Sequence, residues 1–154
     1  MTNLEHINNF LDNLLYLKNY SQETINNYQR DLLQLNQALS DKNIISLTHS
    51  DILIWIKKLH AQGNSPKTLQ RKLSSVRSFF NFLINSEIVS QNPANGIKAP
   101  KDSKRLPKVV NTDELAYLLD INPSNDIEAR DIACFDLLYS CGIRLSELSS
   151  VELK

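Results

Sequence analysis

Residues Ser65–Leu83, SPKTLQRKLSSVRSFFNFL, lie near the middle of a 154-residue chain and carry its clearest helical pattern. Serine followed by proline predicts a helix start, because serine caps the first turn and proline has a backbone angle suited to it. At about 100° per residue, the apolar positions fall on one stripe. These positions are Leu69, Leu73, Val76, Phe80 and Leu83. Such a stripe needs other helices to cover it, so the stretch predicts a bundle built around one long helix that runs to about Asn85.

Three further helices are predicted on its N-terminal side. Thr2 and Glu5 make a capping box before the first helix. Ser21 is a cap for the second, and Thr48 with Asp51 for the third. The positions predicted to face inward are Ile7, Phe10, Leu11, Leu14, Leu15 and Leu17 in the first helix. In the second helix they are Ile25, Tyr28, Leu32, Leu35 and Leu39, and in the third Ile52, Trp55, Ile56 and Leu59. Because no alternating strand pattern appears, we expect an all-α fold with a four-helix bundle over residues 1–92.

The pattern breaks at Pro93 and resumes at Thr112. Residues 93–111 hold three prolines, one glycine and five basic side chains, which predicts an unpacked linker. A helix is expected from Thr112 to Ile121, another up to Cys141, and the beginning of a third after Gly142. Three short helices bury too little to complete a domain, so residues 112–154 are expected to be the first part of a truncated one.

Charge is distributed unevenly although the chain is neutral, with 17 basic and 17 acidic residues. Residues 1–64 carry a net charge of −1, residues 65–108 of +7 and residues 109–154 of −6. A basic segment between acidic ones favours binding of a polyanion, the alternative being a solvated basic linker.

The polar side of the fourth helix carries this basic character. Lys67, Arg71, Ser74 and Ser78 fall opposite the apolar stripe, with Arg77 and Asn81 along its edge. Long cations reach phosphates or guanine edges, and serines let the backbone approach closely, so this face suits the DNA major groove. Asn27, Arg30 and Gln34 make a weaker candidate face on the second helix, equally consistent with ordinary surface.

The segment Gly142–Leu148, GIRLSEL, is the second candidate site. Gly142 is expected to end one helix in the left-handed conformation, which places Arg144 at the corner where the next begins. A guanidinium held there is suited to grip a phosphate. The alternative is a surface arginine that pairs with Glu147.

Four segments in order resemble the tyrosine recombinases, also called the phage integrase family. GIRLSEL resembles their first-arginine motif, with Cys141 where threonine is common. Ser21–Leu32 and Ser65–Leu83 resemble the two blocks of their core-binding domain, and Asn92–Lys108 resembles their linker, closest to the Xer-type chromosomal enzymes.

This resemblance implies a SAM-like core-binding bundle (1–92), a basic linker (93–111) and the start of a catalytic domain (112–154). It implies site-specific DNA recombination, with strand cleavage and rejoining through a 3′-phosphotyrosine. DNA integration, chromosome partition in the cell cycle and, most specifically, chromosome-dimer resolution are the processes implied. Only the first arginine maps here, as Arg144, with Glu147 behind it. The implied nucleophile and the other catalytic groups have no counterpart in these residues, so the chain alone is expected to bind DNA without cutting it.

The helix faces, the composition and the resemblance together set expectations for ligands and partners. The DNA contacts expected are Lys67, Arg71, Ser74, Arg77, Ser78, Asn27, Arg30, Lys101, Lys104 and Arg105. No cofactor, metal, small-molecule substrate or membrane is expected, and the partners implied are duplex DNA and a recombinase tetramer of self or paralogue. Cys134 and Cys141 are interpreted as core residues of a cytoplasmic protein, and His6, His49 and His60 as surface or cap residues.

Two other interpretations stay open. One is a non-catalytic DNA-binding module or decayed integrase relative, and the other is a helical protein-interaction module without a DNA role. The sequence does not specify the target site, or distinguish a chromosomal enzyme from a phage or transposon integrase.

Overall fold

The computed structural model describes residues 1–40, 42–100, 111–112, 117, 119–120 and 122–151. The chain divides into two compact units, Met1–Lys104 and Arg105–Lys154. Every regular element among the described residues is a helix and no strand occurs among them, which confirms the all-α prediction. None of the helices in these ranges combines the length and apolarity that a bilayer span requires.

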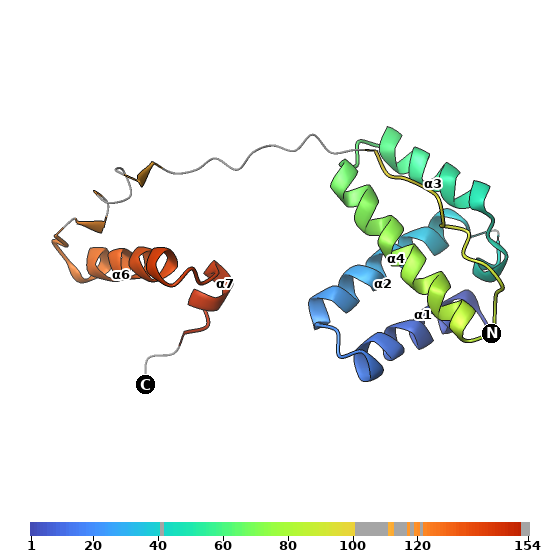
Figure 1. Ribbon diagram of the computed structural model, residues 1–154, viewed down its shortest axis with the longest axis horizontal. Coiled ribbons are helices and arrows are strands. Elements are labelled where there is room, and N and C mark those ends of the chain that lie inside the picture. The colour runs from blue at the N-terminus through green and yellow to red at the C-terminus, as the bar shows by residue number, and fades with distance from the viewer. Residues whose placement is uncertain (41, 101–110, 113–116, 118, 121, 152–154) are drawn as a thin grey trace. The chain divides into compact units, whose positions relative to one another are not determined.

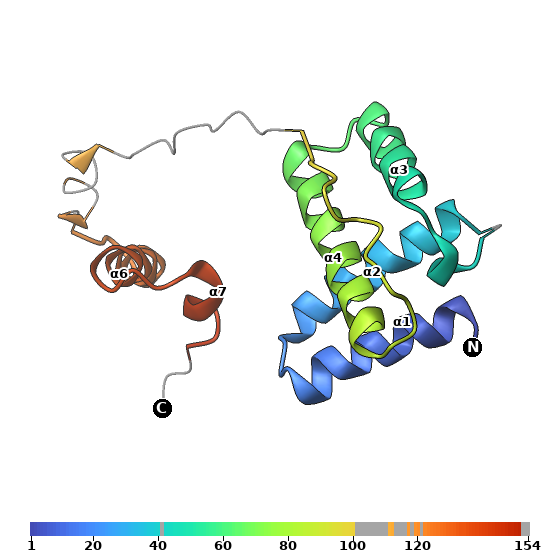
Figure 2. The same cartoon turned by 45° about the vertical axis from the view of Figure 1, so that its right-hand side comes forward.

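The first unit is a bundle of four helices, α1 (Asn3–Asp12), α2 (Gln22–Ala38), α3 (His49–Ala61) and α4 (Pro66–Asn85). A π-helical turn, Asn13–Leu17, follows α1, and a 3-10 turn, Ile44–Ser46, precedes α3. Helix α4 packs against each of the other three, as the two views of the bundle show (Figures 1 and 2). The bundle is therefore built around α4, as its stripe predicts.

The predicted helix starts are confirmed by their caps. Thr2 and Thr48 each complete a capping box, with Glu5 and Asp51 respectively. The hydroxyl of Ser65 accepts the Thr68 N–H at 3.2 Å, and Pro66 begins α4. These local contacts set where each helix enters the bundle.

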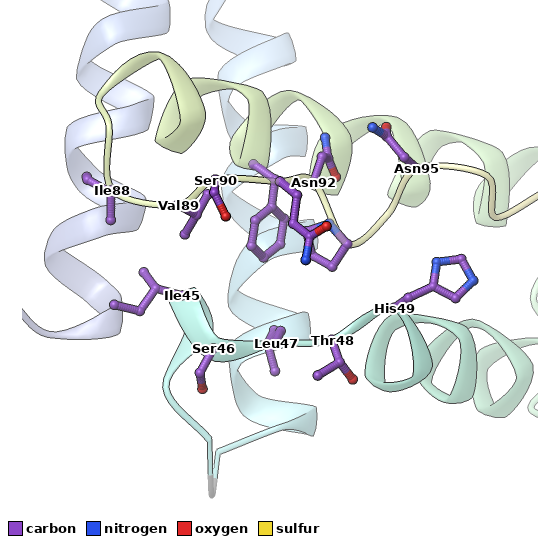
Figure 3. A pocket seen from close by; sticks show the side chains of 13 residues that line it. Ile45, Ser46, Leu47, Thr48, His49, Ile88, Val89, Ser90, Asn92 and Asn95 are labelled. Atoms are coloured by element: carbon purple, nitrogen blue, oxygen red, sulfur yellow. The ribbon is translucent and has the colours of Figure 1, made fainter.

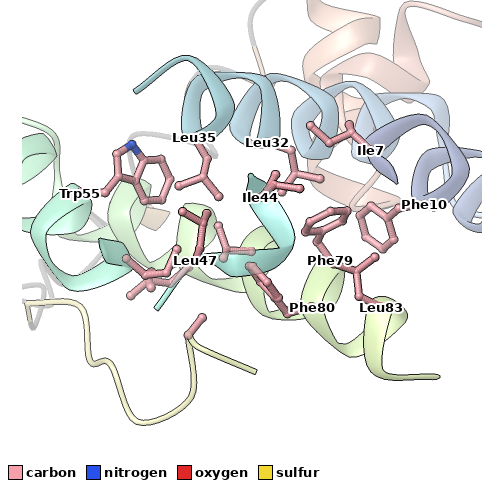
Figure 4. Packing of buried hydrophobic residues seen from close by; sticks show 14 of the residues in the cluster. Ile7, Phe10, Leu32, Leu35, Ile44, Leu47, Trp55, Phe79, Phe80 and Leu83 are labelled. Atoms are coloured by element: carbon pink, nitrogen blue, oxygen red, sulfur yellow. The ribbon is translucent and has the colours of Figure 1, made fainter. Parts of the chain in front are cut away.

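The core lies between the four helices (Figure 4). All five predicted stripe positions of α4 are buried, and Phe79 joins them. The ring of Phe10 meets that of Phe79 edge to face with centroids 5.5 Å apart, which ties α1 to α4. Trp55 is buried as expected, although its indole N–H has no hydrogen-bond partner among the described residues.

Two predictions about the N-terminal helix are wrong. Leu17, predicted to lie inside, is 75% exposed, because the π-helical turn changes the helical spacing before that residue is reached. His6, predicted at the surface, is buried, since it lies next to Ile7 and one turn before Phe10 on the inward side of α1. His49 and His60 are exposed, as predicted.

The segment after α4 differs from an unpacked linker over its first residues. Ala94 and Ile97 are buried in the core of the bundle. Figure 2 shows the chain returning along α4 over this stretch. Both side chains are apolar, and their burial removes them from water and covers the core beside α4. The packed part of the first unit therefore extends past residue 92.

The second unit contains α6 (Asp126–Ser140) and α7 (Leu145–Leu148). Asn125 caps α6 by accepting the Glu128 N–H at 2.9 Å, and Gly142 ends the helical run with a positive φ of 61°, as predicted. Most of the helix expected over residues 112–121 lies outside the described residues.

The two cysteines of the second unit do not lie in a core. Neither α6 nor α7 has a buried residue. Cys134 is half-buried and Cys141 is exposed, so the interpretation of both as core residues is wrong. The reason is that the apolar side of α6 has no covering layer among the described residues.

Candidate nucleic-acid interface

A row of hydrogen bonds between polar side chains, here called the polar seam, joins α2 to α4. The two helices are antiparallel along it, so later residues of α2 pair with earlier residues of α4. Tyr28 lies 3.4 Å from Ser78 between hydroxyl oxygens, the Ser75 hydroxyl donates to Asp31 at 2.8 Å, and the Lys72 ammonium donates to Gln34 at 2.5 Å. The two helices that carry the predicted DNA-contact residues of the bundle are thus fixed against each other.

Three of the predicted residues line one hollow at the N-terminal half of α4. The hollow has a volume of about 480 Å³, and its lining is Ser65, Lys67, Thr68, Gln70, Arg71 and Ser74. Lys67 and Ser74 are exposed, and no carboxylate is among the lining residues. Cations, hydroxyls and an amide around an open hollow make a surface that can accept a phosphate.

Arg71 is the best fixed cation of this hollow. Its Nη1 donates to Oδ2 of Asp31 at 2.5 Å, while its side chain stays 39% exposed. The guanidinium therefore has one donor committed to the bundle and others available at the surface.

Arg77 and Ser78 have internal partners instead. The Arg77 Nε donates to the carbonyl of Ala94 at 3.2 Å, and its Nη2 donates to the carbonyl of Ile97. Ser78 is half-buried against Tyr28. The structure thus engages both side chains within the bundle, because the chain after α4 returns past Arg77.

The other predicted contact residues lie either on α2 or outside the described ranges. Arg30 is exposed and Asn27 is half-buried. Lys101, Lys104 and Arg105 lie outside the described residues.

A larger hollow of about 640 Å³ opens between residues 45–49 and 88–95 (Figure 3). Ile45, Ile88 and Val89 line it together with hydroxyl and amide side chains, and no lysine or arginine is among its lining residues. Without cations it is less suited to hold a phosphate than the hollow of α4. A third hollow, of about 350 Å³, has Lys18, Ser78 and Asn81 among its lining residues, so it places the predicted contact Ser78 beside an exposed lysine.

In the second unit, Arg144 and Glu147 form an ion pair that also includes a hydrogen bond to the backbone. The Arg144 Nη1 donates to Oε1 of Glu147 at 2.8 Å, and the Arg144 backbone N–H donates to Oε2 at 2.8 Å. These hydrogen bonds, the backbone one first, lower the pKa of the Glu147 carboxyl below its usual value. Glu147 thus holds the guanidinium in place, and the Arg144 side chain is 80% exposed.

Asp31 and Lys72 are site residues that the sequence analysis missed. Asp31 is fully buried and accepts from Arg71, Lys72 and Ser75. A signal was present, since Asp31 stands next to Leu32 and one turn before Leu35 on the inward side of α2. A carboxylate at such a position needs a cationic partner.

The chain is similar to curated tyrosine recombinases over nearly its whole length. Tyrosine recombinase XerC of Alcanivorax borkumensis is 42% identical over 97% of this chain and 50% of the relative. XerC of Actinobacillus pleuropneumoniae is 40% identical over 94% of this chain and 48% of the relative. XerD of Oceanobacillus iheyensis is 34% identical over 96% of this chain and 51% of the relative. The chain thus spans about half the length of the curated relatives it matches.

The fold is similar to a solved integrase. The structure of the Tn1549 transposon integrase in complex with circular intermediate DNA matches with a TM-score of 0.70 at 21% identity, over 98% of this chain and 49% of that one. The family model described as "Phage integrase, N-terminal SAM-like domain" matches residues 7–87, which include α2, α3 and α4 and more than half of the chain. Through this domain, the chain belongs to the phage integrase family.

Proposed function

We propose that this chain is the DNA-binding N-terminal part of a Xer-type tyrosine recombinase. The observation that carries the proposal is the match to curated Xer recombinases over nearly all of the chain, at 34% to 42% identity in the three relatives described above. The activity proposed for the whole protein is cleavage and rejoining of DNA at specific sites through a 3′-phosphotyrosine, with resolution of chromosome dimers as its role. A tetramer on DNA, of self or paralogue, belongs to this proposal.

Duplex DNA is proposed to lie on the polar face of α4 and the adjoining face of α2. Lys67, Arg71 and Ser74 supply donors around the hollow of α4, and exposed Arg30 and half-buried Asn27 are the contacts proposed on α2. Lys101, Lys104 and Arg105 are proposed to contact the backbone beyond the bundle. Cationic side chains on exposed surface supply the phosphate contacts that dominate affinity for DNA.

Arg144 is proposed to stabilise charge on the phosphate being transferred, with Glu147 as its positioning partner. The 80% exposure of Arg144 and its pair with Glu147 fit both this role and the alternative of a surface ion pair, and the resemblance of GIRLSEL to the first-arginine motif favours this role. A fixed guanidinium costs little reorganisation when charge develops on a phosphate oxygen. The other groups of the reaction are proposed to belong to the longer protein, so residues 1–154 alone are expected to form no covalent DNA adduct.

The test of the DNA face is Lys67→Glu. Lys67 is exposed and lines the hollow, so reversal of its charge should leave the bundle folded. We expect weaker binding to duplex DNA in a mobility-shift titration, and a fall of about one or more in the slope of log K against log salt. Arg71 is unsuitable for this reversal, because a glutamate there would face the buried carboxylate of Asp31.

The matched control is Lys57→Glu, the same change at an exposed lysine of α3. It should reduce binding only slightly, through net charge. Equal losses in the two variants would contradict the assignment of the α4 face, and binding that does not respond to salt would contradict DNA binding itself.

A further inference from the structure

The buried carboxylate of Asp31 is the centre of an ionic cluster that links α2 to α4. Its Oδ2 accepts from Arg71 Nη1 at 2.5 Å and from the Ser75 hydroxyl at 2.8 Å, and its Oδ1 accepts from Lys72 Nζ at 3.0 Å. Asp31 has no exposed surface. A buried carboxylate is stable only when paired and hydrogen-bonded, and here both oxygens are satisfied.

The cluster holds two cations for one carboxylate. Lys72 is the inner cation: its side chain is only 7% exposed, and its second hydrogen bond, to Gln34, also lies in the seam. Lys72 alone is sufficient to neutralise Asp31. Arg71 is therefore an additional positive charge, and the cluster carries a net charge of +1.

Arg71 is the outer cation, and its free donors are at the surface. Its side chain is 39% exposed, and within the described residues its guanidinium has no hydrogen bond other than the one from Nη1 to Asp31. A guanidinium has five N–H donors in a rigid planar fork, so one bond to Asp31 fixes the direction of the rest. Arg71 also lines the hollow that Lys67 and Ser74 share, which contains no acidic residue.

We propose that Asp31 is a positioning residue for DNA binding: its buried carboxylate holds the Arg71 guanidinium so that the free donors meet a phosphate of the DNA backbone. The inference rests on the proposed function and adds to it a residue that does not itself touch DNA. Because Arg71 is already ordered in the free protein, little side-chain freedom is lost on binding. Asp31 thus increases the affinity for DNA, although its negative charge alone would repel the phosphates and decrease it.

The experiment measures binding of the 154-residue chain to a fluorescein-labelled duplex of about 30 base pairs by anisotropy at several salt concentrations. The main variant is Asp31→Leu with Lys72→Met, which removes the buried pair, leaves Arg71 in place and keeps the net charge. Replacement of a buried ion pair by apolar side chains is often tolerated, and circular dichroism reports whether the variant is folded. We expect binding about three- to tenfold weaker than in the parent chain, the cost of ordering one long side chain.

Arg71→Gln, alone and combined with the Asp31 and Lys72 changes, separates positioning of Arg71 by Asp31 from a purely structural role of Asp31. We expect it to weaken binding by at least the same factor, and we expect a smaller loss when it is added to the Asp31 and Lys72 changes than when it is made in the parent chain, because all three act through one interaction with the phosphate. The matched control is Asp12→Leu with Lys57→Met, the same two changes at exposed positions, which should leave affinity unchanged.

A second variant covers the case in which the main one does not fold. Arg71→Lys keeps the charge but replaces the planar fork by a single ammonium, so positioning predicts a loss close to that of Arg71→Gln, and charge alone predicts parent affinity. Parent-like affinity in Arg71→Lys, or in the folded Asp31 and Lys72 variant, overturns the inference while the proposed function stands. Absence of salt-dependent binding in the parent chain overturns both.

Discussion

Asp51 shows how a single side chain begins a helix and also joins it to the preceding segment. Its Oδ2 accepts the Thr48 backbone N–H at 2.9 Å and the Thr48 hydroxyl at 2.8 Å, and its Oδ1 accepts from Lys42 at 2.5 Å. The hydrogen bond from Lys42, followed by the one from the Thr48 backbone, lowers the pKa of the Asp51 carboxyl to about 2. The ionised form is therefore the one that stabilises the start of α3.

This lowered pKa predicts the pH dependence of an Asp51→Asn variant. The folded pKa lies below the unfolded value of about 3.9, so the carboxylate stabilises the fold fully above that value and progressively less as the pH falls towards 2. We expect the parent chain to unfold at a higher urea concentration than the variant near neutral pH, and the difference to close between about pH 5 and pH 2. Lys42→Gln, which removes the ammonium donor, should show a smaller difference of the same sign. A difference that stays constant to pH 2 would exclude Asp51 as its source.

At this scale, local interactions were predictable and distant ones were not. The caps at Thr2, Ser21, Thr48 and Ser65 each join residues three positions apart, so sequence spacing alone predicts them. Asp31 and Arg71 are 40 positions apart, and only the packing of α2 on α4 brings them together. The sequence shows that both are charged, but not that one holds the other.

Among the elements, the segment that follows α4 is held by two side chains. Asn92 donates to the Arg77 carbonyl at 3.0 Å and accepts the Ala94 N–H at 2.9 Å. Arg77 in turn donates to the carbonyls of Ala94 and Ile97. These hydrogen bonds keep Ala94 and Ile97 against the core and fix where the chain leaves the bundle.

The variant Arg77→Met tests whether Arg77 stabilises the segment after α4 or contacts DNA. The variant keeps an unbranched side chain but removes both donors, so we expect a decrease of about 1–3 kcal/mol in the free energy of unfolding. Urea unfolding measures the decrease, and hydrogen exchange should be faster at the Ala94 N–H. Lys67→Met, at an exposed position of the same helix, should change stability little. If Arg77→Met left stability unchanged and lowered DNA affinity instead, Arg77 would act as a DNA contact.

Helix α4 was predictable as an element and the segment after it was not. Five apolar positions repeat along α4 with helical period, and each is buried. Ala94 and Ile97 follow no such period, and they stand among prolines, asparagines and a glycine that are typical of linkers. Their burial depends on hydrogen bonds from α4, which composition does not reveal.

For the whole molecule, the positive charge in the middle of the sequence extends beyond the α4 face. Residues 65–100 hold five basic residues and one acidic residue, and residues 101–108 hold four basic residues and one acidic residue. Residues 109–154 are acidic, with a net charge of −6. Affinity for DNA is therefore expected to depend on where cations lie rather than on the net charge of the chain, which is zero.

The salt dependence of binding tests how much the segment beyond the bundle contributes. The variant changes Lys101, Lys104 and Arg105 to glutamine, which removes three cations at once. Each cation that no longer contacts a phosphate lowers the slope of log K against log salt by about 0.9. We expect a fall of about 2.7 if all three meet the backbone, measured by anisotropy between about 50 and 200 mM salt. The control changes Lys57 and Lys58, two exposed lysines of α3, to glutamine, and it should leave the slope nearly unchanged. An equal fall in slope per cation removed in the two variants would mean that net charge, and not contact with phosphates, sets the affinity.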